Sequence, residues 1–142
     1  MKAPDSPVGT HLLADLHGVD ADLLQNGVAL ELLLRRAAEV AGARVLYSQF
    51  HSFGAGDGVT GVVLLAESHI SIHTWPESGL AAADIFMCGS ADPGRTLAVL
   101  IDGLAPARQH VHTLARGFAE RMASLADADG QGCVDIHLTL AG

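Results

Sequence analysis

Residues 59–87 read VTGVVLLAESHISIHTWPESGLAAADIFM, and this stretch decides the fold of the chain. Residues 59–66 form a nearly continuous apolar run, which predicts a central strand covered on both faces. In residues 68–73 apolar and polar side chains alternate, which predicts a strand with one buried face. Residues 74–79 are expected to form a turn or loop, and residues 80–87 another strand. The centre of the fold is therefore expected to be a β-sheet.

Two amphipathic helices are expected on either side of this stretch. The first has its apolar residues at the spacing of one helix face, and Gly42 suits its C-terminal end. Those apolar residues are Leu30, Leu33, Leu34, Ala37, Ala38 and Ala41. The second helix begins with Asp92 as N-cap and Pro93 at the first helical position, and Pro106 ends it. Each helix is expected to bury one apolar stripe against a flat surface.

The rest of the chain adds further elements to this pattern. Together they predict an α+β fold, a two-layer sandwich with helices on one face of a mostly antiparallel sheet. Because the other sheet face also needs cover, we expect the sheets of two copies to pair across a homodimer. The remaining predicted elements are strands at 10–16, 43–51 and 108–114, a loop at 54–58, a short helix near 118–126 and a strand at 133–140.

The length of the chain suits one domain, residues 1–142, with a single core. A net charge of −8 argues against a nucleic-acid partner, because phosphate binding needs clustered Lys and Arg side chains. The longest apolar run, residues 62–66, is too short to cross a bilayer, so no membrane partner is expected. Cys88 and Cys133 form no disulfide framework, and no apolar signal region is present, so a cytoplasmic protein is expected.

Side chains suited to catalysis gather in residues 67–88, which hold serines, histidines, carboxylates and a thiol. Such a set suits acyl transfer, because nucleophiles and bases lie together. A metal site is disfavoured. His69 and His73 are separated by roughly 13 Å along a strand, and the pair His110 and His112 has no third ligand. No metal is therefore expected.

The segment ESHISIHTWPE, residues 67–77, closely resembles the processing-site motif of the bacterial and archaeal S-adenosylmethionine decarboxylases. Further matching segments are HLLADLHG, SQFHSF, GVTGVVLLAE and AADIFMCG. The resemblance covers roughly residues 10–115, and an eleven-residue motif with flanking matches is specific.

The resemblance implies a zymogen that cuts its own backbone between Glu67 and Ser68. The products would be a β chain of residues 1–67 and an α chain of residues 68–142. Ser68 would become a pyruvoyl group, the covalent cofactor, whose ketone forms a Schiff base with the amine of a small amino-acid-type substrate. Loss of carbon dioxide from S-adenosylmethionine would then supply aminopropyl groups for spermidine. In relatives the active site lies between two protomers.

The resemblance also implies roles for individual residues. Ser68 is the cofactor precursor, and His73 matches the processing histidine, expected to help remove a proton during elimination. Thr60 stands where many relatives have serine, and its hydroxyl is a candidate to assist the acyl shift. Cys88 matches the catalytic thiol that returns a proton to the substrate. Without the motif, Cys88 would more simply be a small buried side chain and His73 a hydrogen-bonded strand residue.

Two residues match those expected to bind the substrate: Phe53, which would stack on adenine, and Glu77, which would hold the ribose hydroxyls. Three positions depart from the family pattern, namely Ser52, Leu80 and Val19. An arginine or ornithine decarboxylase that uses the same pyruvoyl chemistry is therefore an alternative. A non-processing binding or regulatory homologue is another.

The spacing of two site residues leaves a geometric question. Ser68 and His73 are an odd number of residues apart, so in a regular strand their side chains point to opposite faces. Their cooperation would require a bend near residues 67–68 or a route through the backbone.

Overall fold

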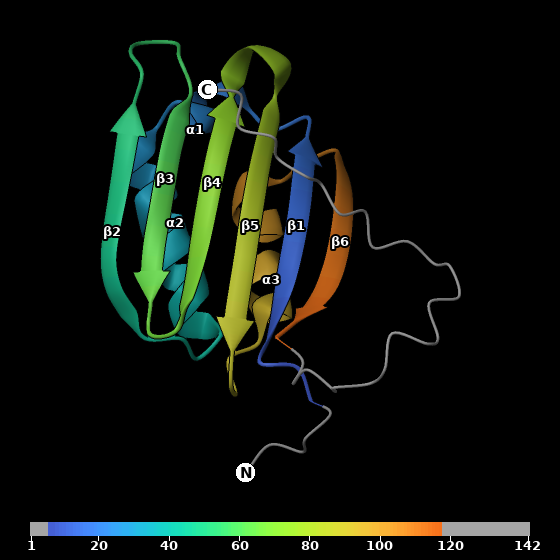
Figure 1. The fold of residues 1–142 in the computed structure, drawn as a ribbon. Helices are drawn as coiled ribbons and strands as arrows, with labels where there is room; N and C mark the ends of the chain where they lie inside the picture. The colour runs from blue at the N-terminus through green and yellow to red at the C-terminus, as the bar shows by residue number, and fades with distance from the viewer. Residues whose placement is uncertain (1–5, 118–142) are drawn as a thin grey trace, which may run out of the picture.

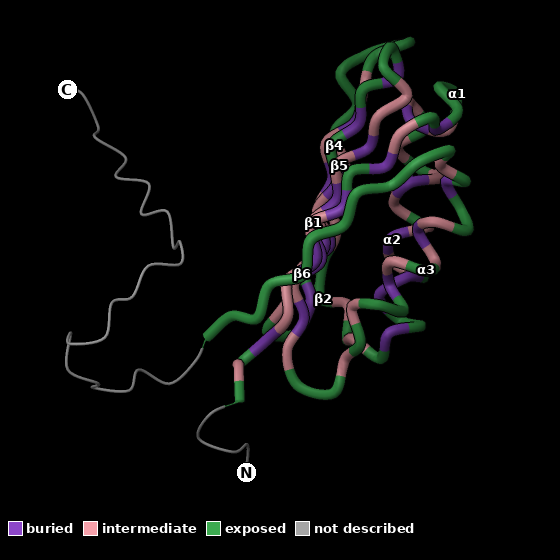
Figure 2. Tube along the Cα trace, turned by 90° about the vertical axis from the view of Figure 1, so that its right-hand side faces the viewer, coloured by how far each residue is buried: buried purple, intermediate pink, exposed green. Residues whose placement is uncertain are grey.

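The computed structural model describes residues 6–117, and in them one antiparallel sheet carries its helices on one face (Figure 1). Figure 2 shows this sheet from the side, with α1, α2 and α3 lying together against it. The strand order is β2-β3-β4-β5-β1-β6. The strands are β1 (Gly9–His17), β2 (Val45–Ser52), β3 (Val59–Leu65), β4 (Ser68–Trp75), β5 (Leu80–Cys88) and β6 (Arg108–Arg116). The helices are α1 (Ala21–Leu24), α2 (Gly27–Val40) and α3 (Pro93–Leu104), with a short 3-10 turn at Pro76–Ser78. The predicted α+β fold with helices on one face is confirmed.

The ends of the long helices follow from local hydrogen bonding. The side chain of Asn26 accepts a hydrogen bond from the backbone of Ala29 and begins α2. After the end of α2, Gly42 adopts a left-handed φ of 83°, as the sequence predicted for this glycine. Asp92 accepts from the backbone of Gly94 and begins α3.

The core lies between the helices and the sheet. Alternate residues of each strand face the helices, and Ile70, Ile72 and Ile85 are fully buried there against Leu34 and Leu100. Burying a side chain of this size contributes about 1.5–3 kcal/mol, so these contacts fix which face of each strand is covered. The site residues on the other face are thereby set in place.

Several sequence predictions need correction. Residue 74 is not in a loop: β4 continues to Trp75, and the hydroxyl of Thr74 is buried, donating to the carbonyl of Leu24 at 2.6 Å. Within one chain, strand β3 is covered on one face only, because Leu64 on the other face is 44% exposed, and cover of that face depends on the expected second copy. Helix α1 was not predicted. The helix near 118–126 and the strand at 133–140 lie outside the described residues.

The sheet face without helices is the open face, and it is chemically unlike the core. Register places cross-strand partners on the same face, so the open face can be followed from His73 through Ala82 to Asp15 and on to His110. All seven histidines within residues 6–117 lie on it, namely His11, His17, His51, His69, His73, His110 and His112.

Candidate active site

The first group of site residues lies where β3 turns into β4 and β5 ends. Leu65 pairs with Ser68, so Ala66 and Glu67 form a two-residue hairpin turn. In this turn Glu67 has a φ of 63°, a left-handed conformation that is uncommon for a residue with a side chain. The predicted cleavage point therefore lies directly after a strained residue.

Hydrogen bonds tie this turn to the end of β5. The backbone N–H of Cys88 donates to the Ser68 hydroxyl oxygen at 3.2 Å. The Cys88 thiol donates to the carbonyl oxygen of Glu67 at 3.3 Å. A hydroxyl, a thiol and the carbonyl between them thus form the Ser68 end of the site. A donor on that carbonyl oxygen would stabilise the negative charge that builds up there during attack by a hydroxyl.

The second group of site residues lies near the other end of β4. Thr60 and His73 are cross-strand partners, and the Thr60 hydroxyl is 2.9 Å from Nδ1 of His73. Beside them is a pocket of about 560 Å³, here called the His73 pocket. Its lining residues are Phe53, Gly56, Asp57, Gly58, Thr60, His73, Thr74, Trp75 and Glu77. The structure therefore brings four residues predicted from the sequence into one cavity: Phe53, Thr60, His73 and Glu77.

Aromatic rings stand beside this pocket. Phe53 is 61% exposed and packs edge-on against the ring of His51, with 4.8 Å between centroids. Trp75 is 41% exposed and tilts against His73 at 6.3 Å. Exposed rings of this kind are suited to stacking on a flat ligand.

The two groups do not meet within one chain. Strand β4 runs without interruption from Ser68 to Trp75, so Ser68 and His73 are separated by roughly 17 Å along the strand. The tight turn at Glu67 precedes Ser68 and leaves the strand regular after it. The side chain of Ser68 lies on the same face of β4 as Ile70 and Ile72, the face toward the helices. The side chain of His73 lies on the open face. The bend that would join them in one chain is absent from β4.

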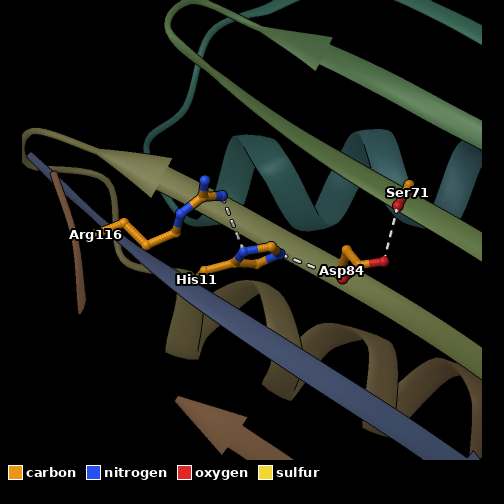
Figure 3. A network of polar contacts seen from close by, with 4 residues as sticks. All are labelled: His11, Ser71, Asp84 and Arg116. Atoms are coloured by element: carbon orange, nitrogen blue, oxygen red, sulfur yellow. Dashed lines mark hydrogen bonds and ion pairs between the residues drawn. The ribbon is translucent and has the colours of Figure 1, made fainter. Parts of the chain in front are cut away.

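A polar network occupies the open face between the two groups (Figure 3). Arg116 donates toward Nδ1 of His11 at 3.4 Å, and Nε2 of His11 lies 3.2 Å from an Asp84 carboxylate oxygen. The other Asp84 oxygen accepts from Ser71 at 3.3 Å. No motif in the sequence pointed to this network. Its signal was the recurrence of polar residues at alternate strand positions facing away from the core.

His69, which follows Ser68 directly, has an altered acidity. Burial lowers the pKa of His69 below its usual value, and the positive charge of a protonated His11 lowers it further. Asp84 acts in the opposite direction, and Arg116 lowers the pKa again. The His69 ring also contacts Phe86, with 5.8 Å between centroids. The neutral imidazole is therefore favoured beside the predicted cofactor position.

Other features of the described residues concern metal binding and membranes. Within residues 6–117, no group of three or more His, Cys, Asp or Glu side chains is arranged to hold a metal ion. The ring of His110 lies 5.6 Å from that of His17, centroid to centroid. In the same part of the chain, no helix is long and apolar enough to cross a membrane.

Asp57 and Trp75 also line the His73 pocket, and the sequence predicted a binding role for neither. Trp75 lies in a segment predicted as a turn or loop, and Asp57 lies in the loop predicted at residues 54–58. Their positions at the pocket depend on how this loop folds against β4.

Comparisons with known proteins agree with the motif. A family model described as S-adenosylmethionine decarboxylase matches residues 10–117. An S-adenosylmethionine decarboxylase proenzyme from Aquifex aeolicus is 42% identical, over 86% of this chain and 90% of that protein. A proenzyme of the same name from Thermococcus onnurineus is 40% identical, over 80% of each chain. One from Caldicellulosiruptor saccharolyticus is 37% identical, over 84% of this chain and 97% of that protein.

A solved structure agrees as well. The crystal structure of the adenosylmethionine decarboxylase from Aquifex aeolicus superposes with a TM-score of 0.75 at 41% sequence identity. The match covers 82% of this chain and 96% of that one. Sequence and fold therefore point to the same relatives.

Proposed function

The chain belongs to the S-adenosylmethionine decarboxylase family, and from this premise we propose that Ser68 is converted into a catalytic pyruvoyl group. The protein is a decarboxylase of a self-processing type, and its substrate is the small molecule S-adenosylmethionine. The product would supply aminopropyl groups for spermidine synthesis, and we expect the reaction to take place in the cytoplasm.

One observation carries the proposal of cleavage between Glu67 and Ser68. The carbonyl of the Glu67–Ser68 link belongs to a residue with a strained φ of 63°, and it accepts a hydrogen bond from the Cys88 thiol at 3.3 Å. The residue that would attack this carbonyl, Ser68, has its hydroxyl held by the backbone of Cys88. Strain that is released on cleavage, together with a polarised carbonyl, favours the scission of this link over its neighbours.

The cleavage would proceed in three balanced steps. The Ser68 hydroxyl adds to the Glu67 carbonyl carbon, the amide C–N bond breaks, and an ester with a free Ser68 amine results. Loss of the Ser68 α-proton then expels the Glu67 carboxylate, which ends the β chain at residue 67. Water finally replaces the nitrogen of the remaining dehydroalanine, releasing ammonia and leaving the pyruvoyl group on an α chain of residues 68–142.

The residues around Ser68 fit such a group. When formed, the pyruvoyl group supplies an electrophilic carbonyl that takes up the electron pair released with carbon dioxide. Cys88, whose thiol lies at the Ser68 end, would return a proton to the substrate α-carbon. Phe53 would stack on the adenine, and Glu77 would accept hydrogen bonds from the ribose hydroxyls. Thr60 and His73, which are hydrogen-bonded to each other, would move the proton during elimination.

The separation of the two groups argues for a homodimer with shared sites. Within one chain, His73 is roughly 17 Å along the strand from Ser68, too far for proton transfer. A two-fold axis through the open face would place the His73 end of one copy over the Ser68 end of the other. Apolar side chains on the open face would be buried in that contact. They include Tyr47, Leu64, Trp75 and Leu114, which are 54%, 44%, 41% and 49% exposed.

Mass spectrometry of the purified protein under denaturing conditions tests the proposal. We expect two polypeptides, residues 1–67 and 68–142, the second with a blocked N-terminus. The matched control is Ser68→Ala, which removes the attacking hydroxyl and should leave one intact chain without decarboxylase activity. An intact wild-type chain would contradict the proposal. Carbon dioxide release from S-adenosylmethionine, arginine and ornithine, supplied separately, tests the substrate.

A further inference from the structure

We propose that Asp57 is a further substrate-binding residue, whose negative charge makes the His73 pocket select a positively charged sulfonium ligand over a neutral thioether. The inference rests on the proposed function, because it takes S-adenosylmethionine as the ligand of this pocket. It concerns how that ligand is distinguished from neutral nucleosides of nearly the same shape.

The loop that carries Asp57 is held in a defined conformation. The backbone of Phe53 donates to the carbonyl of Gly58 at 3.1 Å, and that of Asp57 donates to Gly54 at 3.2 Å. A third bond runs from the backbone of Gly56 to the side chain of Gln25 at 3.0 Å. Three bonds in so short a loop hold its backbone in one conformation.

The loop also lies close against β4. A Cβ atom at Gly58 would overlap the carbonyl oxygen of Thr74, so only glycine permits this approach. Residue 57 is thereby brought next to the end of β4, where Trp75 and Glu77 line the same cavity. Asp57 enters the pocket because of this backbone contact.

The charge of Asp57 is not neutralised by its surroundings. No described residue, from 6 to 117, forms a hydrogen bond or ion pair with the side chain of Asp57 or of Glu77. No Lys or Arg is among the lining residues of the pocket. Two unpaired carboxylates at one cavity create a negative potential, which raises the affinity for a cation relative to a neutral molecule.

The aromatic rings at the pocket act in the same direction. The faces of Phe53 and Trp75 attract a cation through their ring quadrupoles. A sulfonium carries a permanent positive charge, whereas the sulfur of a thioether does not. The pocket therefore offers both kinds of contact that discriminate between the two ligands.

The test compares a charged and an uncharged ligand of similar shape. In Asp57→Asn, which keeps the size and removes the charge, we expect the KM for S-adenosylmethionine to rise about three- to tenfold. The kcat and the extent of self-cleavage should stay as in the wild type. The inhibition constant of the thioether S-adenosylhomocysteine, which keeps the amino-acid chain of the substrate and has an uncharged sulfur, should change less than twofold.

The matched control is Asp102→Asn, which makes the same change in net charge on the exposed surface of α3. This variant should leave unchanged both the KM for S-adenosylmethionine and the inhibition constant of the thioether. An unchanged KM in Asp57→Asn, or an equal loss of affinity for both ligands, would overturn the inference.

A further measurement separates this inference from the proposed function. Calorimetry on the Ser68→Ala chain, with and without Asp57→Asn, gives the affinities for both ligands without any cleavage or turnover. Loss of affinity for the sulfonium alone supports the role of Asp57, and equal affinities contradict it. An uncut wild-type chain would count against the proposed function. The calorimetric comparison would still test the role of Asp57, because it needs no cleavage.

Discussion

The two ends of β4 differ in how they are built. At the Ser68 end, a hydroxyl, a thiol and a backbone carbonyl are hydrogen-bonded to one another beside a strained residue, Glu67. At the other end, side chains surround an open pocket of about 560 Å³, and its two carboxylates, Asp57 and Glu77, have no partner among residues 6–117. The Ser68 end therefore suits an alteration of the chain itself, and the other end suits the binding of a ligand. In the proposed homodimer, each copy would contribute one end to a shared site.

The largest expected effect tests whether the two ends act between copies. We predict that the His73→Ala chain stays uncut alone and is cut when it is co-expressed with the Ser68→Ala chain. In the mixed dimer the intact His73 of one copy would meet the intact Ser68 of the other. With equal expression and random pairing, about half of the His73→Ala chains should be cut, as read by mass spectrometry.

The control for this experiment replaces Ser68→Ala by the double variant Ser68→Ala, His73→Ala. No copy then has an intact His73, and no cleavage is expected. If His73→Ala remained uncut with both partners, the two ends would have to cooperate in another arrangement.

A smaller effect is expected from relieving the strain at the Ser68 end. A left-handed backbone costs a residue with a side chain about 1–2 kcal/mol, and glycine avoids most of this cost. We therefore predict that Glu67→Gly slows self-cleavage about fivefold, because the uncut chain no longer holds strain that cleavage releases. The rate is measured as the decay of intact chain after synthesis.

Two variants serve as controls for the strain. Ala105→Gly relieves the other left-handed non-glycine residue within residues 6–117, at a φ of 45°, far from the cleavage site in the sequence. It should leave the cleavage rate unchanged. Glu67→Gln keeps the strain and removes the charge, and it should also cleave at the wild-type rate. Equal slowing in Glu67→Gly and Glu67→Gln would assign the effect to the carboxylate.

The smallest expected effect concerns His69, which lies between the two ends. Because its pKa is lowered in the folded chain, mainly by burial, the folded state binds a proton less readily than the unfolded state. At a pH above its usual pKa of 6.5, this histidine is neutral in both states and does not change the stability of the fold. As the pH falls below that value, the unfolded chain binds the proton more readily, and the fold is destabilised. We predict that the Ser68→Ala chain loses about 1–3 °C more in Tm between pH 7.5 and 5.5 than the same chain with His69→Gln.

Measuring this in the uncut background keeps cleavage from changing the melting temperature. His110→Gln is a suitable control, because His110 is an exposed histidine on β6, away from the Asp84 network. Its pH dependence shows how much of the difference comes from exchanging a histidine for a glutamine at all. An identical pH dependence with and without His69 would contradict the predicted effect.

Much of the fold was predictable from patterns in the sequence. The alternation around Ile70 and Ile72 predicted β4 and its buried face, and the signals at Asp92 and Pro93 predicted the start of α3. Helix α1 was missed because four residues are too short to show a periodic pattern. The boundary of β4 was misplaced because Thr74 is polar, and its hydroxyl is satisfied in the core by Leu24, far away in the sequence.

The candidate site was predictable only in part. The motif identified Ser68, His73 and Cys88 as candidates, and the roles assigned to them remain predictions. Their separation into two groups follows from the uninterrupted β4, which keeps Ser68 and His73 roughly 17 Å apart along the strand, and their odd spacing had already placed the two side chains on opposite faces. The direct contact of Cys88 with Glu67 was not predictable, because it depends on where β5 ends relative to the turn.

The sequence by itself determined the family, the residue types at the site and the buried face of β4, because these depend on local spacing and on a contiguous motif. Only the tertiary structure decided which residues lie together. It places the Cys88 thiol against Glu67 and brings Asp57 and Glu77 to one pocket, and it keeps these two groups apart within one chain. The physical reason is that strand register and loop closure join positions far apart in the chain.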